Sequence, residues 1–250
     1  MIALITGASS GIGRDTAIEL SQRGYKLILV SRDIQKLEEL KSIIKTESEI
    51  VIMDLTIEEN CKKLFEKYKD IDILVNNAGF GDCGNFDETS LDKDIKMIKT
   101  NIIAYHILTK LYLKEMIQKD SGKILNVASI AGFMPGPLMT TYYSTKSYVV
   151  KLSESIREEL RRRKSNVQIS ILCPGPVNTN FNKVADVEFS LKGLSSKYVA
   201  QYAIKKLFKG KFYIVPGWKI RLARIGAQVA PSSFVAKISY NMQRRKKIGK

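Results

Sequence analysis

Short apolar runs alternate with amphipathic stretches along most of this 250-residue chain, and that alternation limits the fold more than any other feature. Six runs are rich in Ile, Val and Leu on both faces, as strands in a covered parallel sheet need to be. With a seventh, they lie at residues 2–6, 26–31, 49–54, 72–77, 122–129, 167–175 and 211–217. Stretches with helical apolar spacing lie between them, at residues 11–24, 33–45, 56–69, 91–119, 142–164 and 197–208. This order predicts an α/β fold with a doubly wound, mainly parallel seven-stranded sheet covered by helices on both faces.

One domain followed by a basic tail is the organisation that the chain indicates. No internal repeat and no linker rich in Gly, Ser or Pro interrupts residues 1–215, and residues 216–250 form an extension that mixes apolar and basic side chains. The net charge of +16 comes almost entirely from that end. Residues 1–188 carry 26 Lys and Arg against 25 Asp and Glu, whereas residues 189–250 carry 15 Lys and Arg and no Asp or Glu. Since the charge is local and no base-reading motif occurs, we do not expect nucleic-acid binding.

Three cysteines and one histidine exclude several kinds of site. Cys61, Cys83 and Cys173 lie far apart in the sequence and form neither a metal-binding nor a redox pair, so we expect reduced thiols in a cytoplasmic protein. His106 is the single histidine, which argues against a histidine-based triad and a zinc site, and we predict no metal. No basic leader precedes the first apolar run and no run is long enough to span a bilayer, so we expect a soluble or surface-attached protein.

A glycine-rich turn, TGASSGIG at residues 6–13, follows the first strand directly and opens the first helix. Glycine suits a backbone that turns sharply beside a ligand, and the free N–H groups at a helix start attract a pyrophosphate. Such a turn also occurs without a ligand, but the strand before it and the helix after it favour nucleotide binding. We predict cofactor contacts at Gly7, Ser9, Ser10, Gly11, Ile12 and Gly13.

The spacing T-G-x-x-x-G-x-G is the first of six motifs that follow one another along residues 2–179. The others are NNAG at residues 76–79, Asn101, Ser129, Tyr142-x-x-x-Lys146 and PGPVNT at residues 174–179. As a set they resemble the short-chain dehydrogenase/reductase family. The resemblance implies a Rossmann-like fold, a nicotinamide cofactor, a small-molecule carbonyl substrate, and a homodimer or homotetramer formed through the two long helices.

The end of the second predicted strand indicates which nicotinamide cofactor is used. NAD-preferring proteins carry an acidic residue there that accepts hydrogen bonds from the adenosine ribose, whereas this chain has Ser31 followed by Arg32. A small hydroxyl and a planar, permanently charged guanidinium suit the additional 2′-phosphate of NADPH. Asp33 argues for NAD, but it is better placed to cap the next helix. We therefore predict NADP (NADPH) as the cofactor.

The resemblance implies the remaining cofactor contacts, which fall on Asp54, Leu55, Asn76, Ala78, Gly79, Tyr142, Lys146, Pro174, Gly175, Val177 and Thr179. The first two would border the adenine, and residues 76–79 would border the adenosine ribose. Residues 174–177 would close over the nicotinamide, with Thr179 facing its amide or the phosphates. An alternative is that the prolines of this turn only break a strand.

Two adjacent tyrosines precede Lys146, and one place is available for a proton donor. A tyrosine hydroxyl can protonate a ketone during reduction, and a nearby ammonium group stabilises the tyrosinate and lowers its pKa. Tyr142 shares a helix face with Lys146, whereas Tyr143 is rotated by about 100°, although it is three residues from the lysine and geometry alone leaves both open. The family's four-residue spacing and its offset from Ser129 select Tyr142.

The resemblance also assigns roles to the polar set. Tyr142 would be the general acid, Lys146 would also hold the nicotinamide ribose, and Ser129 would polarise the carbonyl oxygen. Asn101 would hold a water that links the lysine to solvent. The structural alternative is a pair of packing tyrosines, a buried helix asparagine and a serine that forms a turn.

The substrate is less well defined by the sequence. Residues 180–195 are expected to form the substrate lid, as their equivalents do in the family. Their apolar composition favours a hydrophobic ketone or a long acyl chain as the substrate. The alternative is that these residues only pack onto the domain. Residues 216–250 resemble the lipid-active, membrane-associated members more than the shorter carrier-protein reductases. An interfacial helix on an anionic bilayer and a solvated basic helix covering the domain are equally open.

Together these features predict an NADPH-dependent oxidoreductase that interconverts a ketone and a secondary alcohol, with a hydrophobic or lipid-like carbonyl substrate. One alternative is a reductase for 3-oxoacyl thioesters, in which the basic tail contacts an acidic carrier or a CoA phosphate. Another is a non-enzymatic NADP-binding regulator, although such a sensor would need no proton donor. A membrane-recruited scaffold would need the tail but not the site.

Overall fold

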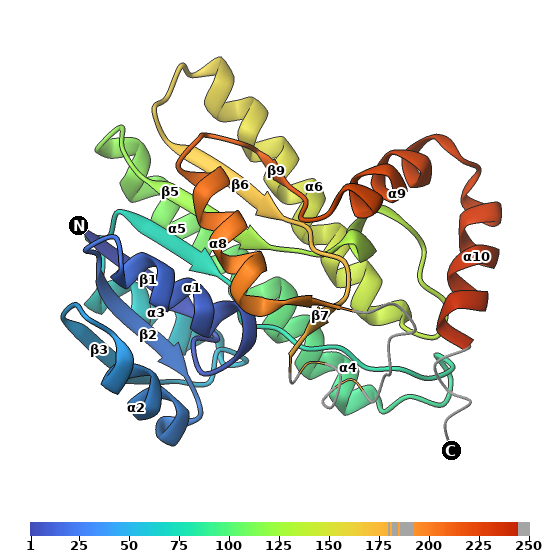
Figure 1. Ribbon diagram of the computed structural model, residues 1–250, viewed down its shortest axis with the longest axis horizontal. Coiled ribbons are helices and arrows are strands. Elements are labelled where there is room, and N and C mark those ends of the chain that lie inside the picture. The colour runs from blue at the N-terminus through green and yellow to red at the C-terminus, as the bar shows by residue number, and fades with distance from the viewer. Residues whose placement is uncertain (180, 182–184, 186–192, 245–250) are drawn as a thin grey trace.

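Seven parallel strands form the central sheet of the protein, in the order β3-β2-β1-β4-β5-β6-β9 (Figure 1). The computed structural model describes residues 1–179, 181, 185 and 193–244. The strands are β1 Ile2–Thr6, β2 Lys26–Ser31, β3 Ser48–Ile52, β4 Ile73–Asn76, β5 Lys123–Val127, β6 Gln168–Leu172 and β9 Tyr213–Ile214. The predicted doubly wound sheet is confirmed. Because strands are added outward from β1 on both sides, a crevice is expected at the carboxyl ends of β1 and β4.

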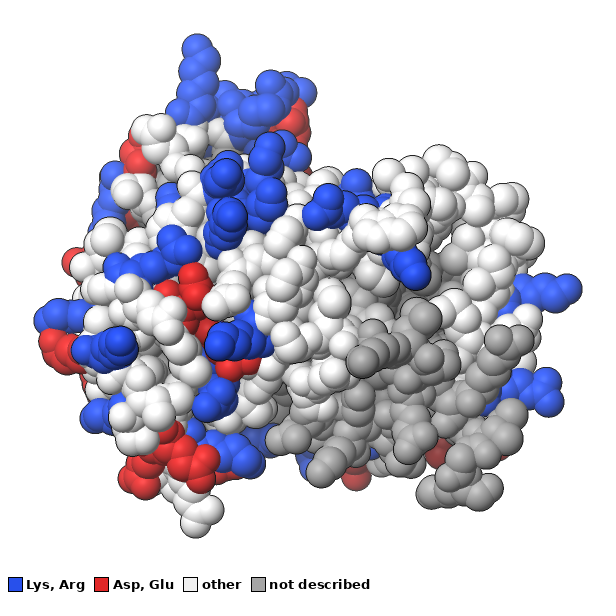
Figure 2. All heavy atoms as spheres, viewed as in Figure 1, with Lys and Arg blue, Asp and Glu red and all other residues white. Residues whose placement is uncertain are grey.

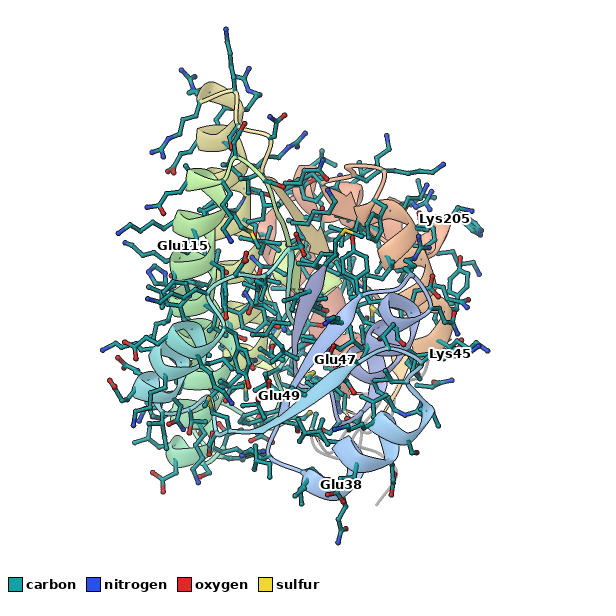
Figure 3. All side chains as sticks on the ribbon, turned by 90° about the vertical axis from the view of Figure 1, so that its left-hand side faces the viewer. Glu38, Lys45, Glu47, Glu49, Glu115 and Lys205 are labelled. Atoms are coloured by element: carbon teal, nitrogen blue, oxygen red, sulfur yellow. The ribbon has the colours of Figure 1, made fainter. Side chains whose placement is uncertain are left out.

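Helices cover both faces of the sheet, and each face has its own apolar core. Figure 3 shows this arrangement, with Glu115 and Lys205 on opposite sides of the strands. The helices α1 Gly11–Ser21, α2 Ile34–Ile43 and α8 Ser196–Leu207 contribute to one core. The opposite face carries α3 Glu58–Lys67, α5 Tyr105–Gln118 and α6 Thr140–Arg162, and α4 Leu91–Ile98 packs against α6. Along β1 the pleat sends Ala3 and Ile5 into one core and Leu4 into the other.

The helix that the sequence predicts over residues 91–119 is interrupted in the structure. After α4 the chain forms a π-helical turn, η1 Lys99–Ala104, before α5 begins. A π turn accommodates an extra residue and is frequently found at functional sites. Here it contains the fully buried Asn101.

Two helices follow β9 and form what we call the C-terminal arm, residues 218–244. They are α9 Trp218–Val229 and α10 Ser232–Arg244, and Pro231 separates them as the sequence predicts. In Figure 1 the arm stands away from the sheet, beside the carboxyl ends of its strands. None of the helices within the described residues has both the length and the apolar composition needed to cross a membrane.

A short parallel pair, β7 Val177–Asn178 with β8 Leu194–Ser195, flanks the predicted substrate lid. Most of that lid, residues 180, 182–184 and 186–192, lies outside the described residues.

Candidate active site

A large cavity contains most of the predicted site, and its volume is about 1170 Å³. Sites for one small ligand commonly have about 300–1,000 Å³, so this cavity has room for a dinucleotide and a second ligand. The predicted residues that line it are Gly7, Ser9, Ser10, Gly11, Ile12, Ser31, Arg32, Asp54, Leu55, Ala78, Gly79, Ser129, Tyr142, Lys146, Pro174, Gly175, Val177 and Thr179. Gly13, Asn76 and Asn101 do not line it. Among the described residues no cluster of His, Cys, Asp or Glu could hold a metal ion.

The turn after β1 depends on glycine at three positions. Gly7 and Gly11 have φ angles of +65° and +54°, a region that strains other residues. A Cβ on Gly13 would clash with the Gly7 carbonyl and the Asn77 amide, so α1 starts directly against the turn. A Cβ on Gly11 would lie 2.9 Å from the Thr179 methyl carbon, which places Thr179 beside the expected phosphate site.

Two residues that the sequence analysis did not single out hold this turn to the end of β4. The Thr6 hydroxyl accepts hydrogen bonds from the backbone N–H groups of Asn77 at 2.9 Å and Ala78 at 3.0 Å. The Asn77 amide donates to the carbonyls of Thr6 at 3.0 Å and Gly7 at 3.1 Å. The signals were present, since Thr6 begins the glycine motif and Asn77 is the second asparagine of NNAG.

Asn76, predicted at the adenosine ribose, is placed in the core instead. Its amide donates to the Thr109 hydroxyl and to the Asn126 carbonyl oxygen, both at 3.0 Å. Successive side chains of a strand point to opposite sides, so its neighbour Asn77 lines the cavity. The structure therefore places Asn77 at the cavity and Asn76 away from it.

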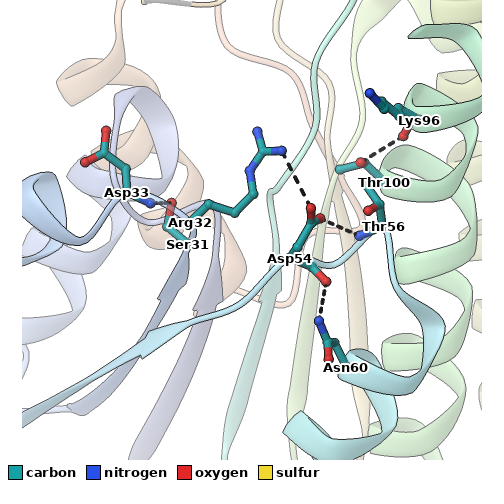
Figure 4. A network of polar contacts seen from close by, with 8 residues as sticks. All are labelled: Ser31, Arg32, Asp33, Asp54, Thr56, Asn60, Lys96 and Thr100. Carbon is teal, nitrogen blue, oxygen red and sulfur yellow. Dashed lines mark hydrogen bonds and ion pairs between the residues drawn. The ribbon is translucent and has the colours of Figure 1, made fainter. Parts of the chain in front are cut away.

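The carboxyl end of β2 forms the part of the cavity where the adenosine end of a dinucleotide is expected (Figure 4). Asp33 caps α2 by accepting a hydrogen bond from the Lys36 N–H at 3.2 Å, which confirms its predicted capping role. The Ser31 hydroxyl donates to the Ser9 hydroxyl at 2.8 Å. The Arg32 side chain is 73% exposed, and its guanidinium lies 3.9 Å from Asp54. This long, exposed contact leaves most of the guanidinium donors accessible to a ligand.

Asp54 lies between two basic side chains, Arg32 and Lys96. Desolvation opposes its ionisation, but hydrogen bonds from Thr56 and the charges of Arg32 and Lys96 hold the pKa of Asp54 below its usual value. The Thr56 backbone N–H donates to Asp54 at 2.9 Å. Arg32 and Lys96 therefore make the surroundings of Asp54 positively charged, which favours a bound anionic group such as a phosphate.

Lys146 is buried, at 4% exposed, beside the catalytic tyrosine candidate. Its Nζ donates to the Val127 carbonyl at 2.9 Å and lies 5.4 Å from the Tyr105 ring centre and 5.9 Å from that of Tyr142. Burial lowers the pKa of Lys146 to about 8. The lysine is therefore charged at neutral pH, but it loses its proton far more easily than an exposed lysine.

Tyr142 and Ser129 share a hydrogen bond in the same cavity. Burial raises the pKa of Tyr142, and the bond with Ser129 offsets this only in part. The predicted lowering of this pKa by the Lys146 ammonium stays a prediction. Ser129 also accepts a hydrogen bond from the Ala131 N–H at 3.1 Å, so it shapes the turn after β5 as well.

Asn101 uses its side chain to position other groups. Its amide donates to the Phe80 carbonyl at 2.9 Å and to the Thr145 hydroxyl at 3.1 Å, and its carbonyl oxygen accepts from the Phe80 N–H at 3.2 Å. A Cβ on Gly79 would lie 2.9 Å from this oxygen and 3.5 Å from Lys146 Nζ. Asn101 thus fixes the loop after β4 next to the lysine, and its role in a water relay stays a prediction.

Tyr143 contacts the C-terminal arm. Its hydroxyl accepts a hydrogen bond of 2.6 Å from the amide of Gln243, which is 3% exposed. The ring packs closely over Gly136, where a Cβ would overlap it. The two tyrosines therefore have separate partners, with Tyr142 next to Ser129 and Lys146 and Tyr143 next to α10.

Both helices of the arm line the same cavity, which the sequence analysis did not predict. Ile220 of α9 packs on the Pro174–Pro176 turn, where a Cβ on Gly175 would lie 2.6 Å from it. The cavity continues from there along Gly226 and Ala227 of α9 to Phe234 of α10. The arm is therefore a wall of the site.

The comparisons with known proteins agree with this geometry. The profile of the family described as short chain dehydrogenase matches residues 1–188. The chain belongs to the short-chain dehydrogenase family. An uncharacterized oxidoreductase of Staphylococcus epidermidis is 32% identical over 189 residues, which cover 74% of this chain and 81% of that protein. The very-long-chain 3-oxoacyl-CoA reductase of Homo sapiens is 35% identical over 192 residues, which cover 73% of this chain and 61% of that protein.

A solved structure of the same family is similar over almost the whole length of this short-chain dehydrogenase. A short-chain dehydrogenase from Sphingobium yanoikuyae in complex with NADPH has a TM-score of 0.81 and 27% identity, over 90% of this chain and 94% of that chain. Membership of this family makes the protein an NAD(P)-dependent oxidoreductase. The family profile ends before the arm, so the arm residues that line the cavity lie outside the matched region.

Proposed function

We propose that this short-chain dehydrogenase interconverts a ketone and a secondary alcohol with NADP(H), and that its substrate is a hydrophobic or lipid-like carbonyl compound. One observation carries the proposal. Tyr142, Ser129 and Lys146 meet in the same cavity as the glycine turn of α1, and this cavity is larger than one ligand requires. A Cβ at Gly7 or Gly13 would clash with Asn77, so the turn packs closely against the end of β4. The start of α1 that follows this turn suits a pyrophosphate.

Each polar group has a defined task in the proposed reduction. The bound nicotinamide supplies the hydride. Tyr142 donates its proton to the carbonyl oxygen, and its raised pKa keeps it protonated until negative charge develops there. Ser129 donates a hydrogen bond to the same oxygen. The Lys146 ammonium, held by the Val127 carbonyl, stabilises the tyrosinate that remains.

The choice of NADPH over NADH rests on the end of β2. Asp33 already accepts from the Lys36 N–H and pairs with the Lys36 ammonium as the helix cap, which disfavours its use for a ribose. The exposed guanidinium of Arg32 lies beside Ser31, and both line the cavity. A 2′-phosphate would replace the weak contact between Arg32 and Asp54 with charge-assisted hydrogen bonds.

Reduction of a 3-oxoacyl thioester is the second candidate. It is supported by the human relative, whose name states this activity, and by the lysines at the cavity, which include Lys93, Lys96 and Lys219. A non-enzymatic regulator is disfavoured because it would need no proton donor, whereas the partly buried Tyr142 lies close to the buried Lys146.

We further propose that the arm contacts an anionic membrane surface. Trp218, Leu222, Ile225 and Val229 form one stripe along α9 and are between 52% and 79% exposed. In Figure 2 the arm presents a mostly uncharged surface with Lys and Arg side chains near its edge. Apolar insertion together with basic side chains is the usual basis of interfacial binding.

For the cell, we propose a cytoplasmic protein that works as an oligomer. Cys61 and Cys173 are buried free thiols, which suits a reducing compartment. The long helices α5 and α6 are the surfaces through which family members are expected to associate, and the pair His106–Tyr148, 2.6 Å apart, joins them.

The first test measures NADPH oxidation with a panel of ketones, from short polar 3-oxo esters to steroids and long-chain 3-oxo lipids. We expect turnover of apolar ketones, and the substitution Tyr142→Phe should lower kcat about 10²–10⁴-fold because the proton donor is lost. Tyr143→Phe is the matched control and should keep activity on the short 3-oxo esters within a few-fold, because its hydroxyl bonds to the arm. If Tyr142→Phe keeps near-normal turnover while Tyr143→Phe loses it, the proposed acid is wrong.

A further inference from the structure

Three apolar side chains of α10 line the cavity while remaining partly open to solvent. Phe234, Ile238 and Met242 follow one another at four-residue intervals and are 57%, 44% and 45% exposed. At a rise of 1.5 Å per residue they form a stripe about 12 Å long. Their neighbours toward the body of the protein, such as Val235 and Gln243, are buried, with only 8% and 3% of their surface exposed. The stripe therefore lies next to the docked face of α10, which is formed by Val235, Ser239 and Gln243, and it is left uncovered.

The opposite side of this part of the cavity is formed by α9, which carries small residues there. Ala223, Gly226, Ala227 and Ala230 line it, and a Cβ built on Gly226 meets no atom within 4 Å. The helix itself is anchored, because the Arg224 guanidinium lies 4.0 Å from the Tyr213 ring centre and Arg221 donates to the Val215 carbonyl at 3.0 Å. The space beside Gly226 is thus bounded by a fixed backbone.

From these two walls we propose that the arm holds the hydrocarbon chain of the substrate, so that the substrate is a carbonyl compound with a long alkyl or acyl chain. The cavity is continuous from Tyr142 and Ser129 to the α10 stripe. A chain attached to the reacting carbonyl can therefore reach the arm while it stays inside the cavity. This inference rests on the proposed reductase function. It goes beyond that function by naming the part of the substrate that the arm binds.

The chemistry of the walls selects this occupant over a polar one. Among the described residues of the arm that line the cavity, Lys219 is the single charged side chain, and it lies at the start of α9. Covering Phe234, Ile238 and Met242 removes apolar surface from water, and each methylene that enters is expected to raise kcat/KM about fourfold. The bond between Gln243 and Tyr143 fixes α10 next to the catalytic helix, which keeps the two walls in register with the reacting carbonyl.

The test compares 3-oxoacyl thioesters of N-acetylcysteamine that carry butanoyl, decanoyl and tetradecanoyl chains. In the wild type kcat/KM should rise with chain length. Gly226→Leu fills the space beside α9 and should lower the ratio of long-chain to short-chain kcat/KM about tenfold, roughly the loss of two buried methylenes. Leucine is a better helix former than glycine, so folding is not at risk. Gln228→Leu, on the exposed side of the same helix, is the matched control and should keep the wild-type ratio.

A binding measurement separates this inference from the proposed function. Calorimetric titration with decanol in the presence of NADPH should show binding that Gly226→Leu weakens about tenfold and Gln228→Leu leaves intact. If the enzyme reduces all chain lengths equally, or if Gly226→Leu has no effect, the arm does not hold the chain, although the reductase stands. If decanol binding behaves as expected but no ketone is turned over, the chain site stands and the proposed reductase falls. If decanol does not bind and no ketone is turned over, the chain site and the proposed reductase both fall.

Discussion

At the scale of single residues, the neighbouring tyrosines of α6 show how one helix serves two parts of a cavity. Tyr142 lies next to Ser129 and Lys146, whereas Tyr143, rotated by about 100°, bonds to Gln243 of the arm. The assignment of Tyr142 follows from spacing along the sequence. The partner of Tyr143 does not, because Gln243 is 100 residues away and no local pattern links the two.

The buried lysine leads to a prediction about pH. Burial lowers the pKa of Lys146 to about 8, so the ammonium is present below that pH and is lost above it. Since the charge stabilises the tyrosinate formed during reduction, kcat/KM for NADPH should fall about tenfold per pH unit above pH 8. The measurement is the pH dependence of kcat/KM, which reports the ionisation of groups in the free enzyme.

Lys146→Arg provides the control for this profile. An arginine stays protonated throughout the range, so whatever activity remains should no longer decrease above pH 8. A wild-type profile that stays flat to about pH 10 would falsify the assignment of this limb to Lys146.

The pair Asn76 and Asn77 shows where motif reasoning reaches its limit. Both belong to NNAG, but the last residue of β4 points into the core and the next one faces the cavity. The motif identifies the segment correctly, while the side that each amide takes depends on where the strand ends. Strand ends are the least certain part of a sequence-based assignment.

At the scale of elements, β2 and α2 separate the two candidate cofactor determinants. The strand ends at Ser31, so Arg32 remains beside the cavity while Asp33 is used as the cap of α2. This division could be predicted, because a capping residue is recognisable from its position before a helical pattern.

The end of β2 yields a prediction about cofactor preference. Arg32→Ala should raise the Kd for NADPH about tenfold or more and leave the Kd for NADH nearly unchanged, because only NADPH carries the phosphate that the guanidinium binds. Titration of both cofactors by fluorescence or calorimetry measures this.

Lys41→Ala is the matched control, because it removes one positive charge from exposed α2 surface that does not line the cavity. Both affinities should stay unchanged in that variant. Equal losses for the two cofactors in Arg32→Ala, or tighter binding of NADH by the wild type, would contradict the preference.

The π-helical turn between α4 and α5 was beyond sequence analysis for a physical reason. Apolar spacing over residues 91–119 is compatible with one continuous helix, and the predicted and observed segments agree apart from the six residues of η1. The wider turn coincides with hydrogen bonds from Asn101 to Phe80 and Thr145, which belong to distant segments. The strands were easier to predict, because continuous Ile, Val and Leu runs indicate them locally.

At the scale of the whole molecule, the arm combines two surfaces. Its inner side lines the cavity, and the α9 stripe from Trp218 to Val229 faces outward. The sequence analysis recognised the apolar and basic composition of this segment and weighed a membrane against a solvated helix. It could not predict the cavity wall, because periodicity shows that a helix has an apolar side without showing what that side meets.

The outer surface of the arm leads to a prediction about membranes. The protein should co-sediment with vesicles that contain anionic lipid, and higher salt should weaken the association because the basic side chains are screened. Replacing Leu222 and Ile225 with serine should lower partitioning roughly tenfold for each side chain removed from the apolar layer.

Ile57→Ser is the control, since this side chain is as exposed as Ile225, at 52%, and directly precedes α3 in the body of the protein. Its partitioning should match the wild type. No sedimentation with anionic vesicles at moderate salt would rule out the membrane contact. A change of mass in light scattering for the double variant would instead identify the stripe as a contact between copies of the chain.

The arm begins after β9, and the family profile ends at residue 188, so the reacting groups and the outer cavity wall come from separate stretches of the chain. Exchange of the last helices between related proteins should therefore transfer a preference for substrate size while the proton donor and the cofactor turn stay as they are. Diversification of this enzyme, by natural variation or by a designed library, has its most accessible starting point at its carboxyl-terminal end.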